Sequence, residues 1–309
     1  MNKNTAGDHG IDRYALSALG VLTLVWGYNW VVMKVALHYA APLTFAWSRT
    51  LGGGLCLLAV LFLFGRRFRP RHFWRVLLLG LLQTTLFIGF TTWSLVHGGA
   101  GKSAVLVYTM PLWVILLAPL TLKERIHGAQ WSALVLALVG LLLILSPWHA
   151  APDTVSSLLA LTAGLCWALS VLVAKKIPVS DSWDLLSLTG WQMVLGAVPL
   201  LAVAWLFPGH AVVWTPAYIG ALAYNILPAN ALAWLLWLFV VGRLPVAVSG
   251  LASLATPVVG VLAAALQLGE RPPPHEIAGM LLVLLALAML TLPWRSRRAN
   301  NRSTKVHGL

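Results

Sequence analysis

The sequence of this chain repeats itself at a constant spacing. The segment from Ser103 to Trp148 matches the segment from Ser249 to Trp294, 146 positions later and without a gap. The matches include rare residue types, which chance seldom aligns in a chain rich in Leu and Ala. They pair Pro111 with Pro257, Glu124-Arg125 with Glu270-Arg271, and Pro147 with Pro293. Internal repeats in an apolar chain are typical of transporters, whose two related halves move around a site between them.

Composition places the chain in a membrane. It is 60% hydrophobic and only 9% charged, whereas soluble domains carry about 25% charged residues. Apolar runs of about 20 residues, long enough to cross a bilayer, recur along nearly its whole length. They lack the alternation of a membrane β-strand, so we predict an all-α membrane protein with ten transmembrane helices. The predicted spans are 14–37, 43–64, 73–95, 102–122, 127–146, 154–175, 185–207, 214–240, 244–267 and 275–294.

The basic residues follow every second predicted span. The net charge is +13, and the connections after the even-numbered spans, with the residues that flank them, carry Arg66, Arg67, Arg69, Arg71, Arg75, Lys123, Arg125, Lys175, Lys176, Arg243, Arg295, Arg297 and Arg298. The alternate connections hold only Lys102 and Arg271. This positive-inside pattern predicts that both termini, and a tail over 295–309, are cytoplasmic. The basic excess therefore indicates topology and no nucleic-acid partner, and the polar N-terminus does not resemble a cleaved signal.

The repeat boundaries predict how the halves are related. Residues 14–148 contain five predicted spans, and 154–294 contain the other five; Trp26 and Lys34 also match Trp167 and Lys175 in the second copy. Because five is odd, the copies enter the membrane from opposite sides, and a two-fold axis in the membrane plane relates them. Two inverted repeats have two nearly equivalent conformations, one open to each side, which is the basis of alternating access.

Each half resembles the EamA domain of the drug/metabolite transporter superfamily. The resemblance rests on Trp26-Gly27 in the first span, a central proline in the fourth, and the Lys-Glu-Arg or Gly-Glu-Arg corner that follows. It covers about residues 14–294. Overall similarity and the 16 Trp residues make the chain most similar to bacterial exporters of aromatic amino acids. The resemblance implies an inner-membrane location and a central cavity against spans one, three, four, six, eight and nine.

Substrate sites in such folds lie near the middle of the membrane, where polar side chains are costly. The candidate substrate-binding residues at that depth are Trp26, Asn29, Gln83, Tyr108, Trp167, Tyr224, Asn225 and Asn230. The amides could instead join helices by hydrogen bonds worth about 0.6 kcal/mol each. The aromatic side chains could equally be packing, above all in the stripe that Trp26 and Asn29 share with Trp30 and Met33.

Other residues admit a structural and a functional interpretation. Pro111 and Pro257 occupy equivalent places in spans four and nine, where each proline forms a gating hinge or a static bend. Lys34, Lys175 and Arg49 are expected to extend their charged groups to the membrane surfaces. The repeated Glu-Arg corners are expected to stabilise turns as ion pairs.

The positions of the acidic residues favour uncoupled transport. All eight acids lie outside the predicted spans or at their edges, whereas proton- and sodium-coupled carriers place a carboxylate within the membrane. No metal-binding or nucleophile motif is present, so we expect no enzyme, no cofactor and no bound metal. We therefore predict a monomeric carrier that exports aromatic and other neutral amino acids by facilitated transport.

Three alternatives remain open from the sequence. A multidrug or other small-metabolite exporter would have every feature described. A sugar-phosphate or nucleotide-sugar carrier would need Lys34, Lys175 or Arg49 to face the cavity. A channel would conduct the solute without alternating access.

Overall fold

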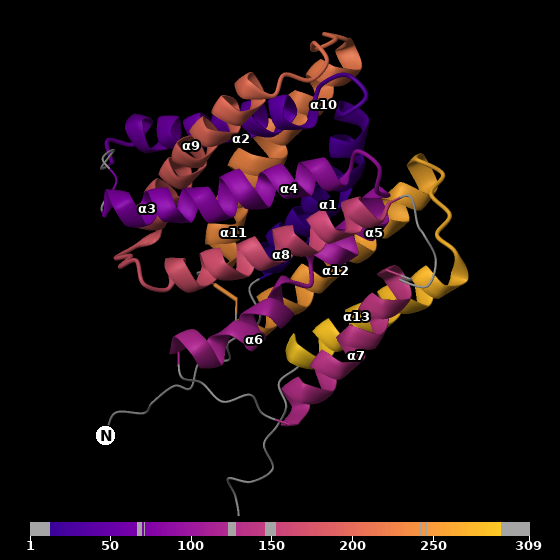
Figure 1. Ribbon diagram of the computed structural model, residues 1–309. Helices are drawn as coiled ribbons and strands as arrows, with labels where there is room; N and C mark the ends of the chain where they lie inside the picture. Colours follow the sequence, from indigo (N-terminus) through magenta and orange to yellow (C-terminus); the bar gives the residue numbers. More distant parts are fainter. Residues whose placement is uncertain are drawn as a thin grey trace, which may run out of the picture.

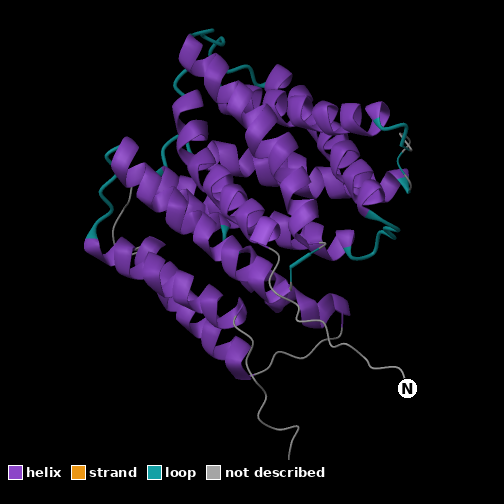
Figure 2. Ribbon diagram, turned by 180° about the vertical axis from the view of Figure 1, so that it is seen from behind, coloured by secondary structure: helices purple, strands orange, loops and turns teal. Residues whose placement is uncertain are grey.

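The computed structural model describes residues 13–66, 70, 72–122, 128–145, 153–241, 243–244 and 246–291. Helices make up this part of the chain, and the described residues contain no strand (Figures 1 and 2). The helices are α1 (Arg13–Ala36), α2 (Pro42–Leu63), α3 (Phe73–Gly80), η1 (Leu81–Leu86), α4 (Phe87–Ser94), α5 (Ala100–Val107), α6 (Met110–Leu122), α7 (Gly128–Leu145), α8 (Thr154–Ala174), α9 (Ser182–Leu206), α10 (Pro216–Ile226), η2 (Leu227–Leu232), α11 (Ala233–Val241), α12 (Val246–Gln267) and α13 (Pro274–Thr291).

Local sequence explains several helix starts. Pro42 begins α2 and Pro216 begins α10, positions where the missing N–H of proline has no helical partner to lose. The Thr215 side chain accepts a hydrogen bond from the Tyr218 N–H, 3.2 Å away, and so caps α10. The Asp181 carboxylate caps α9 in the same way, with the Asp184 N–H as donor at 2.8 Å.

Seven helical stretches are long and apolar enough to cross a membrane. They are Arg13–Ala36, Pro42–Leu63, Phe73–Ser94, Ala100–Leu117, Thr154–Ala174, Ser182–Leu206 and Pro216–Val240. Three shorter apolar helices cover Gln130–Leu145, Ala255–Gln267 and Pro274–Leu290. The all-helical, multi-pass prediction is confirmed, while the count of ten spans in two inverted copies stays a prediction.

Two of these stretches contain a π-helical turn. In the third predicted span, η1 separates α3 from α4; in the eighth, η2 separates α10 from α11. The two turns begin at Leu81 and Leu227, which are 146 positions apart, the spacing of the sequence repeat. Pro228 disturbs the hydrogen-bond ladder of η2, whereas η1 contains no proline. Such turns are rare and are frequent at functional sites.

The long helices pack closely because glycines lie at their crossings. α2 lies against α9, α7 against α13, and α1 against α12 (Figure 1). A Cβ on Gly140 of α7 would stand 2.7 Å from the Gly279 carbonyl oxygen of α13, and a Cβ on Gly279 would stand 2.6 Å from that of Gly140. Small residues at crossings allow this close backbone approach, which membrane helices use for association.

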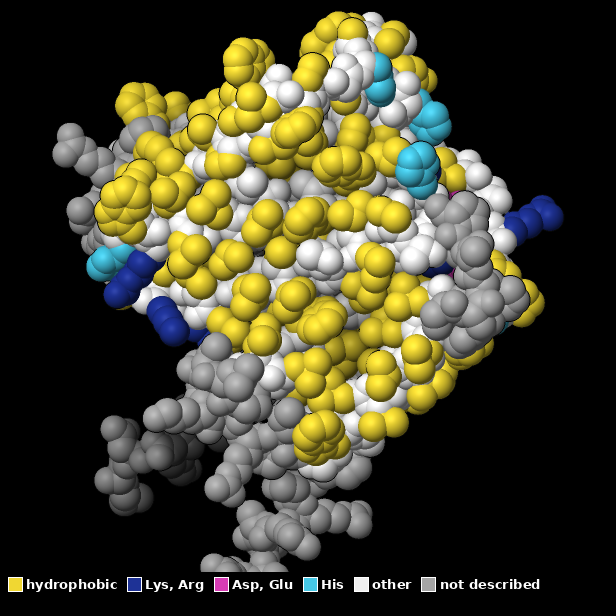
Figure 3. Space-filling view, in the orientation of Figure 1, with side chains coloured by type: hydrophobic (Ala, Val, Ile, Leu, Met, Phe, Trp, Pro, Cys, Tyr) yellow, Lys and Arg dark blue, Asp and Glu magenta, His cyan; other side chains and the backbone are white. Residues whose placement is uncertain are grey.

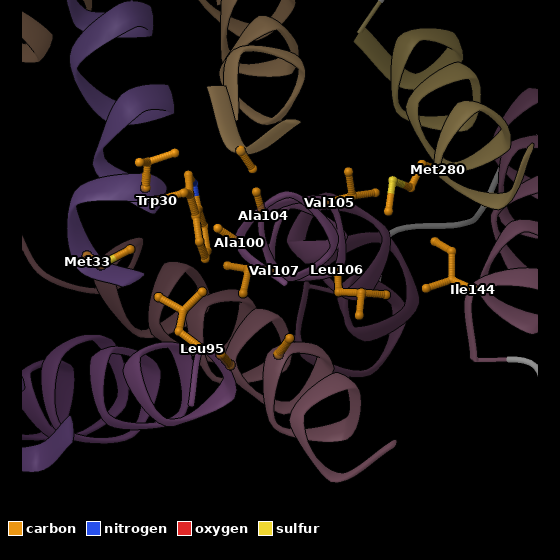
Figure 4. Packing of buried hydrophobic residues seen from close by; sticks show 14 of the residues in the cluster. Trp30, Met33, Leu95, Ala100, Ala104, Val105, Leu106, Val107, Ile144 and Met280 are labelled. Carbon is orange, nitrogen blue, oxygen red and sulfur yellow. The ribbon is translucent and has the colours of Figure 1, made fainter. Parts of the chain in front are cut away.

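The largest core cluster joins α1, α5, α7 and α13. Trp30 lies beside Ala100 and Ala104 of α5, while Met280 of α13 faces Ile144 of α7 (Figure 4). Outside this core, apolar side chains cover most of the face drawn in Figure 3, and the Lys, Arg and His side chains in view lie toward its edges. An apolar flank with charged rims is the surface expected of a protein embedded in lipid.

The bundle has two ends, which we name after their residues. The Lys102 end holds the connections around 37–41, 95–99, 207–215 and 268–273, together with Lys102 itself. The Arg243 end holds the opposite connections, with Arg66, Arg75, Lys175, Lys176 and Arg243 among the described residues. Arg75 joins two of these connections by donating a hydrogen bond to the Lys176 carbonyl oxygen, 2.9 Å away.

Candidate functional site

Trp26 is held by the eighth predicted span. Its indole N–H donates to the Ala229 carbonyl oxygen of η2 at 3.0 Å. Its ring lies 6.0 Å from the Trp234 ring and 6.1 Å from the Trp237 ring, measured between centroids. This hydrogen bond gives a partner to a backbone carbonyl of η2, a π-helical turn in which the regular backbone hydrogen bonds of an α-helix are interrupted. Trp26 therefore packs α1 against η2 and α11, and its role in substrate binding stays a prediction.

Asn29 occupies an unusual position on the same helix. The side chain is buried, with 8% of its surface exposed, and its Oδ1 has no hydrogen-bond partner. A buried acceptor without a partner costs about 1–3 kcal/mol. Packing alone does not explain the residue, because an apolar side chain of similar size would avoid this cost. The Oδ1 of Asn29 is therefore a buried hydrogen-bond acceptor that a bound ligand can use.

The three candidate residues of the eighth predicted span form hydrogen bonds with two different helices. The Tyr224 hydroxyl donates to the Val25 carbonyl oxygen of α1 at 2.8 Å. Asn225 is fully buried, and its Oδ1 accepts from Arg49 Nη1 at 3.1 Å. Asn230 donates from Nδ2 to the Arg49 carbonyl oxygen at 3.2 Å. Tyr224 therefore joins the span to α1, whereas both asparagines join it to α2.

The remaining candidates lie on the third, fourth and sixth predicted spans. Trp167 of α8 packs on Phe87 of α4, with ring centroids 4.7 Å apart. Tyr108 lies in the break between α5 and α6. Gln83 is half-buried within η1. The structure brings Trp167 and Phe87 together, but it does not gather all eight candidates into one cluster.

The two equivalent prolines have different helical surroundings. Pro111 follows an interruption at Tyr108 and Thr109, after which α6 begins at Met110. Pro257 lies inside α12, which continues to Gln267. The fourth predicted span is therefore two helices, and the ninth contains one helix through its proline. Whether either proline acts as a hinge stays a prediction.

The expectation that Arg49 reaches the membrane surface was wrong. Only 3% of its surface is exposed, and it lies between α2 and α10. Lys34 is half-buried, and its Nζ donates to the carbonyl oxygens of Leu95, Val96 and Gly98, which follow α4. A cation at that place satisfies carbonyl groups that a helix end leaves without partners.

Glu270 also differs from its predicted role. Its carboxylate accepts from the Ala100 N–H at 2.6 Å and from the Gly101 N–H at 3.1 Å. A carboxylate at a helix N-terminus satisfies free N–H groups and interacts favourably with the helix dipole. Glu270 therefore caps α5 from a distant part of the chain, in place of the turn-stabilising role that the sequence suggested.

Lys102 forms the centre of an ion-pair network beside this cap. The residue is 5% exposed, and its Nζ lies 2.8 Å from Glu276 Oε1 and 3.0 Å from Asp153 Oδ2. Sequence reasoning missed this cluster. The signal was available, because Lys102, Asp153 and Glu276 all lie at the edges of predicted spans that share one face of the membrane.

Together these features define an apolar, multi-pass helical bundle whose buried polar groups lie between helices. The described residues contain no group of His, Cys, Asp and Glu that could hold a metal ion. The model of the EamA-like transporter family matches the chain over residues 14–146 and again over 154–292. The chain therefore belongs to the EamA-like transporter family, within the drug/metabolite transporter superfamily, as its sequence predicted.

Several relatives align over most of the chain. The uncharacterized transporter YoaV of Bacillus subtilis is 28% identical over 91% of this chain and 98% of its own length. A protein of Escherichia coli named "Probable amino-acid metabolite efflux pump" is 29% identical, over 91% of this chain and 97% of its own. A solved crystal structure covers 93% of this chain and 99% of its own, with a TM-score of 0.63 and 18% identity, and shows the likeness of fold.

These comparisons give the chain a transport role. The family transports small molecules across membranes, and the named efflux pumps make small-molecule export the general function. The relatives with bacterial sources agree with a multi-pass bacterial membrane protein.

Proposed function

We propose that this protein exports neutral amino acids, aromatic ones included, across the bacterial inner membrane by alternating access. The observation that carries the proposal is the buried Oδ1 of Asn29, an acceptor without a partner that suits the ammonium group of an amino acid. The ring pair of Trp167 and Phe87 offers an apolar surface to a side chain. Relatives in Escherichia coli and Salmonella typhimurium named as amino-acid metabolite efflux pumps support the same substrate class.

The proposed mechanism uses two inverted copies, residues 14–148 and 154–294. The helix contacts support it, because equivalent spans make equivalent contacts: α1 with α12 parallels α8 with α5 and α6, and α3 with α9 parallels α10 with α2. The two π-helical turns at the repeat spacing agree with this arrangement. The Arg243 end is cytoplasmic in this proposal, because basic residues collect there, and the Lys102 end is periplasmic. The tail over 295–309 lies outside the described residues.

The proposed transport needs no coupling ion. The described acids lie at helix ends or in connections, and the described part of the spans holds no carboxylate that could carry a proton. A net-neutral solute moves down its own gradient in such a carrier.

Transport of phenylalanine from proteoliposomes tests this proposal. We expect efflux that saturates, that is accelerated by amino acid on the opposite side, and that is unchanged when a pH gradient is imposed or collapsed. Flux without counterflow would identify a channel. Efflux that follows the proton gradient would contradict uncoupled transport, and inhibition by lipophilic cations but not by amino acids would favour a multidrug exporter.

The replacement Asn29→Leu separates stability from transport. We expect it to raise the stability of the folded protein by about 1 kcal/mol, because it removes a buried acceptor that has no partner. The same change should lower the rate of amino-acid transport at least tenfold. Thermal unfolding of the purified protein and proteoliposome efflux measure the two effects.

Asn230→Ala is the comparison for stability alone, because that amide donates a hydrogen bond to the Arg49 carbonyl oxygen. It should lower stability by about 1 kcal/mol. Unchanged transport by the Asn29→Leu variant would remove Asn29 from the site.

A further inference from the structure

Arg49 is a cation buried inside the bundle, and no described residue provides it with a counter-ion. It lies seven residues into α2, about 10 Å along the helix from its first residue. Its Nη1 donates to Asn225 Oδ1 at 3.1 Å, and its Cζ lies 5.8 Å from the centre of the Phe45 ring. Its Nε is buried and has no hydrogen-bond partner. Among the described residues, Asp153 and Glu276 pair with Lys102, and no ion pair reaches Arg49.

The second half of the chain provides an internal comparison for this position. In α2, Arg49 is followed by Gly53, whose added Cβ would stand 2.6 Å from the Asn230 Cβ of η2. In α9, Gln192 is followed by Gly196, whose added Cβ would stand 2.5 Å from the Thr84 Cβ of η1. Both glycines come four residues after the polar side chain, and Thr84 and Asn230 occupy the same place in their π-helical turns.

The crossing of η1 with α9 shows that close packing at such a place needs no charged side chain. Thr84 donates from Oγ1 to Gln192 Oε1 at 2.7 Å, and no charge takes part. A helix crossing of this kind is therefore closed by an uncharged pair. The positive charge at Arg49 needs another explanation, since an unpaired charge in a low-dielectric interior is strongly unfavourable.

Charged side chains inside membrane spans pair with one another or with backbone carbonyls, and they mark the paths of substrates and ions. Asn225 accepts from Nη1 of the guanidinium, and the buried Nε on the edge beside it has no hydrogen-bond partner. That edge is the planar donor fork that binds carboxylates. The buried hydroxyls of Thr91 and Thr92, on α4 beside α2, also lack partners.

We propose that Arg49 binds the carboxylate of the transported solute and so selects amino acids over amines. This inference rests on the proposed function, and it gives a role in that function to the buried charge of Arg49. Phe45 and Asn225 cover the guanidinium in the present conformation. The carboxylate therefore reaches it when α10 separates from α2, and the solute supplies the counter-ion that the described residues do not provide.

The test compares phenylalanine with its decarboxylated amine, phenethylamine, and with phenylalaninamide. In proteoliposomes, Arg49→Gln should lower phenylalanine transport about ten- to a hundredfold, since a hydrogen bond to a charged group is lost. The amine and the amide should change less than threefold. Gln192→Ala on the equivalent crossing is the control, and it should affect all three solutes alike. Equal losses for the three solutes in Arg49→Gln would mean a structural role and would overturn the proposal.

A second variant tests the proposal even if the Arg49→Gln protein does not fold. Asn225→Asp is nearly isosteric and places a carboxylate 3.1 Å from the Arg49 guanidinium, where the amide oxygen now lies. The internal ion pair should offset the loss of the hydrogen bond from Asn225 Nδ2 to the Ala221 carbonyl oxygen. It should also compete with the solute, so that phenylalanine transport falls at least tenfold. Normal phenylalanine transport in a folded Asn225→Asp variant would also overturn the proposal.

Thermal protection separates this inference from the export proposal. Phenylalanine and phenylpyruvate should raise the melting temperature of the wild-type protein, phenethylamine should not, and Arg49→Gln should lose the effect. Wild-type protein that is protected by these carboxylates but transports no amino acid would contradict the export proposal alone. Wild-type protein that none of the carboxylates protects would contradict the role of Arg49.

Discussion

Replacing Gly196 by valine is expected to destabilise the protein severely. A Cβ at this position of α9 would stand 2.4 Å from the Gly80 carbonyl oxygen and 2.5 Å from the Thr84 Cβ. The first contact is with backbone, so rotation of a side chain cannot relieve it. Overpacking costs about 1–3 kcal/mol in ordinary cores and more where helix backbones must separate. We expect a large fall in melting temperature, or protein that no longer elutes as a single species in detergent.

Gly220→Ala is the matched control for this experiment. Gly220 lies in α10, and an added Cβ there meets no atom within 4 Å. Alanine favours helix by about 1 kcal/mol relative to glycine, so this variant should be at least as stable as wild type. If Gly196→Val melts at the wild-type temperature, α3, η1 and α9 cannot be as close as described.

Removing the Glu270 carboxylate is expected to open the Lys102 end. Glu270→Ala takes the acceptor from two N–H groups at the start of α5. Hydrogen bonds to a charged group contribute about 1.5–3 kcal/mol each. A loss of about 3 kcal/mol would raise the population of an open form roughly a hundredfold. The cap joins residues of the two segments that match the family model, so its loss should affect movement between them.

Cysteine labelling measures this opening. Ser103 is 2% exposed in α5, and Ser103→Cys is a nearly isosteric reporter for a membrane-impermeant maleimide. The native Cys56 and Cys166 are free thiols and would be replaced in the background. We expect much faster labelling of the reporter in Glu270→Ala than in the parent.

Asp181→Ala provides the comparison for labelling, because this carboxylate caps α9 within its own first turn at the opposite end. It should cost about 1 kcal/mol of helix stability and leave labelling unchanged. Equal labelling of the Glu270→Ala variant and its parent would show that the cap does not close this end.

The helical, membrane-spanning character of the chain and the positions of its helices were predictable from the sequence. A bilayer fixes the length and polarity of a spanning helix, so apolar runs located the helices to within a few residues. The repeated Glu-Arg corner located a residue that matters, Glu270, although its role as the cap of α5 needs a contact between positions 170 residues apart. Sequence spacing gives the depth of a residue along a helix but not its neighbour across a helix crossing.

That limit explains the error at Arg49. Its place near one end of α2 was correct, but the direction of its side chain was not. A long cation at that depth can reach the surface or turn between helices, and the choice depends on Asn225 of a span far along the chain. The candidate residues of the eighth span were hard to place for a related reason, because Tyr224 and Asn225 precede a π-helical turn and Asn230 lies within it.

The two π-helical turns also bear on how such a chain can arise. One extra residue in a turn rotates the rest of the helix by about 100° relative to an uninterrupted α-helix. The two parts of the third predicted span meet different partners: α3 lies mainly against α9, and α4 mainly against α8, whereas α10 and α11 of the eighth both lie against α1. An ancestral half that already carried the extra residue would pass it to both copies in a single gene duplication. One inserted codon, copied once, would then place a π-helical turn in both halves of the chain.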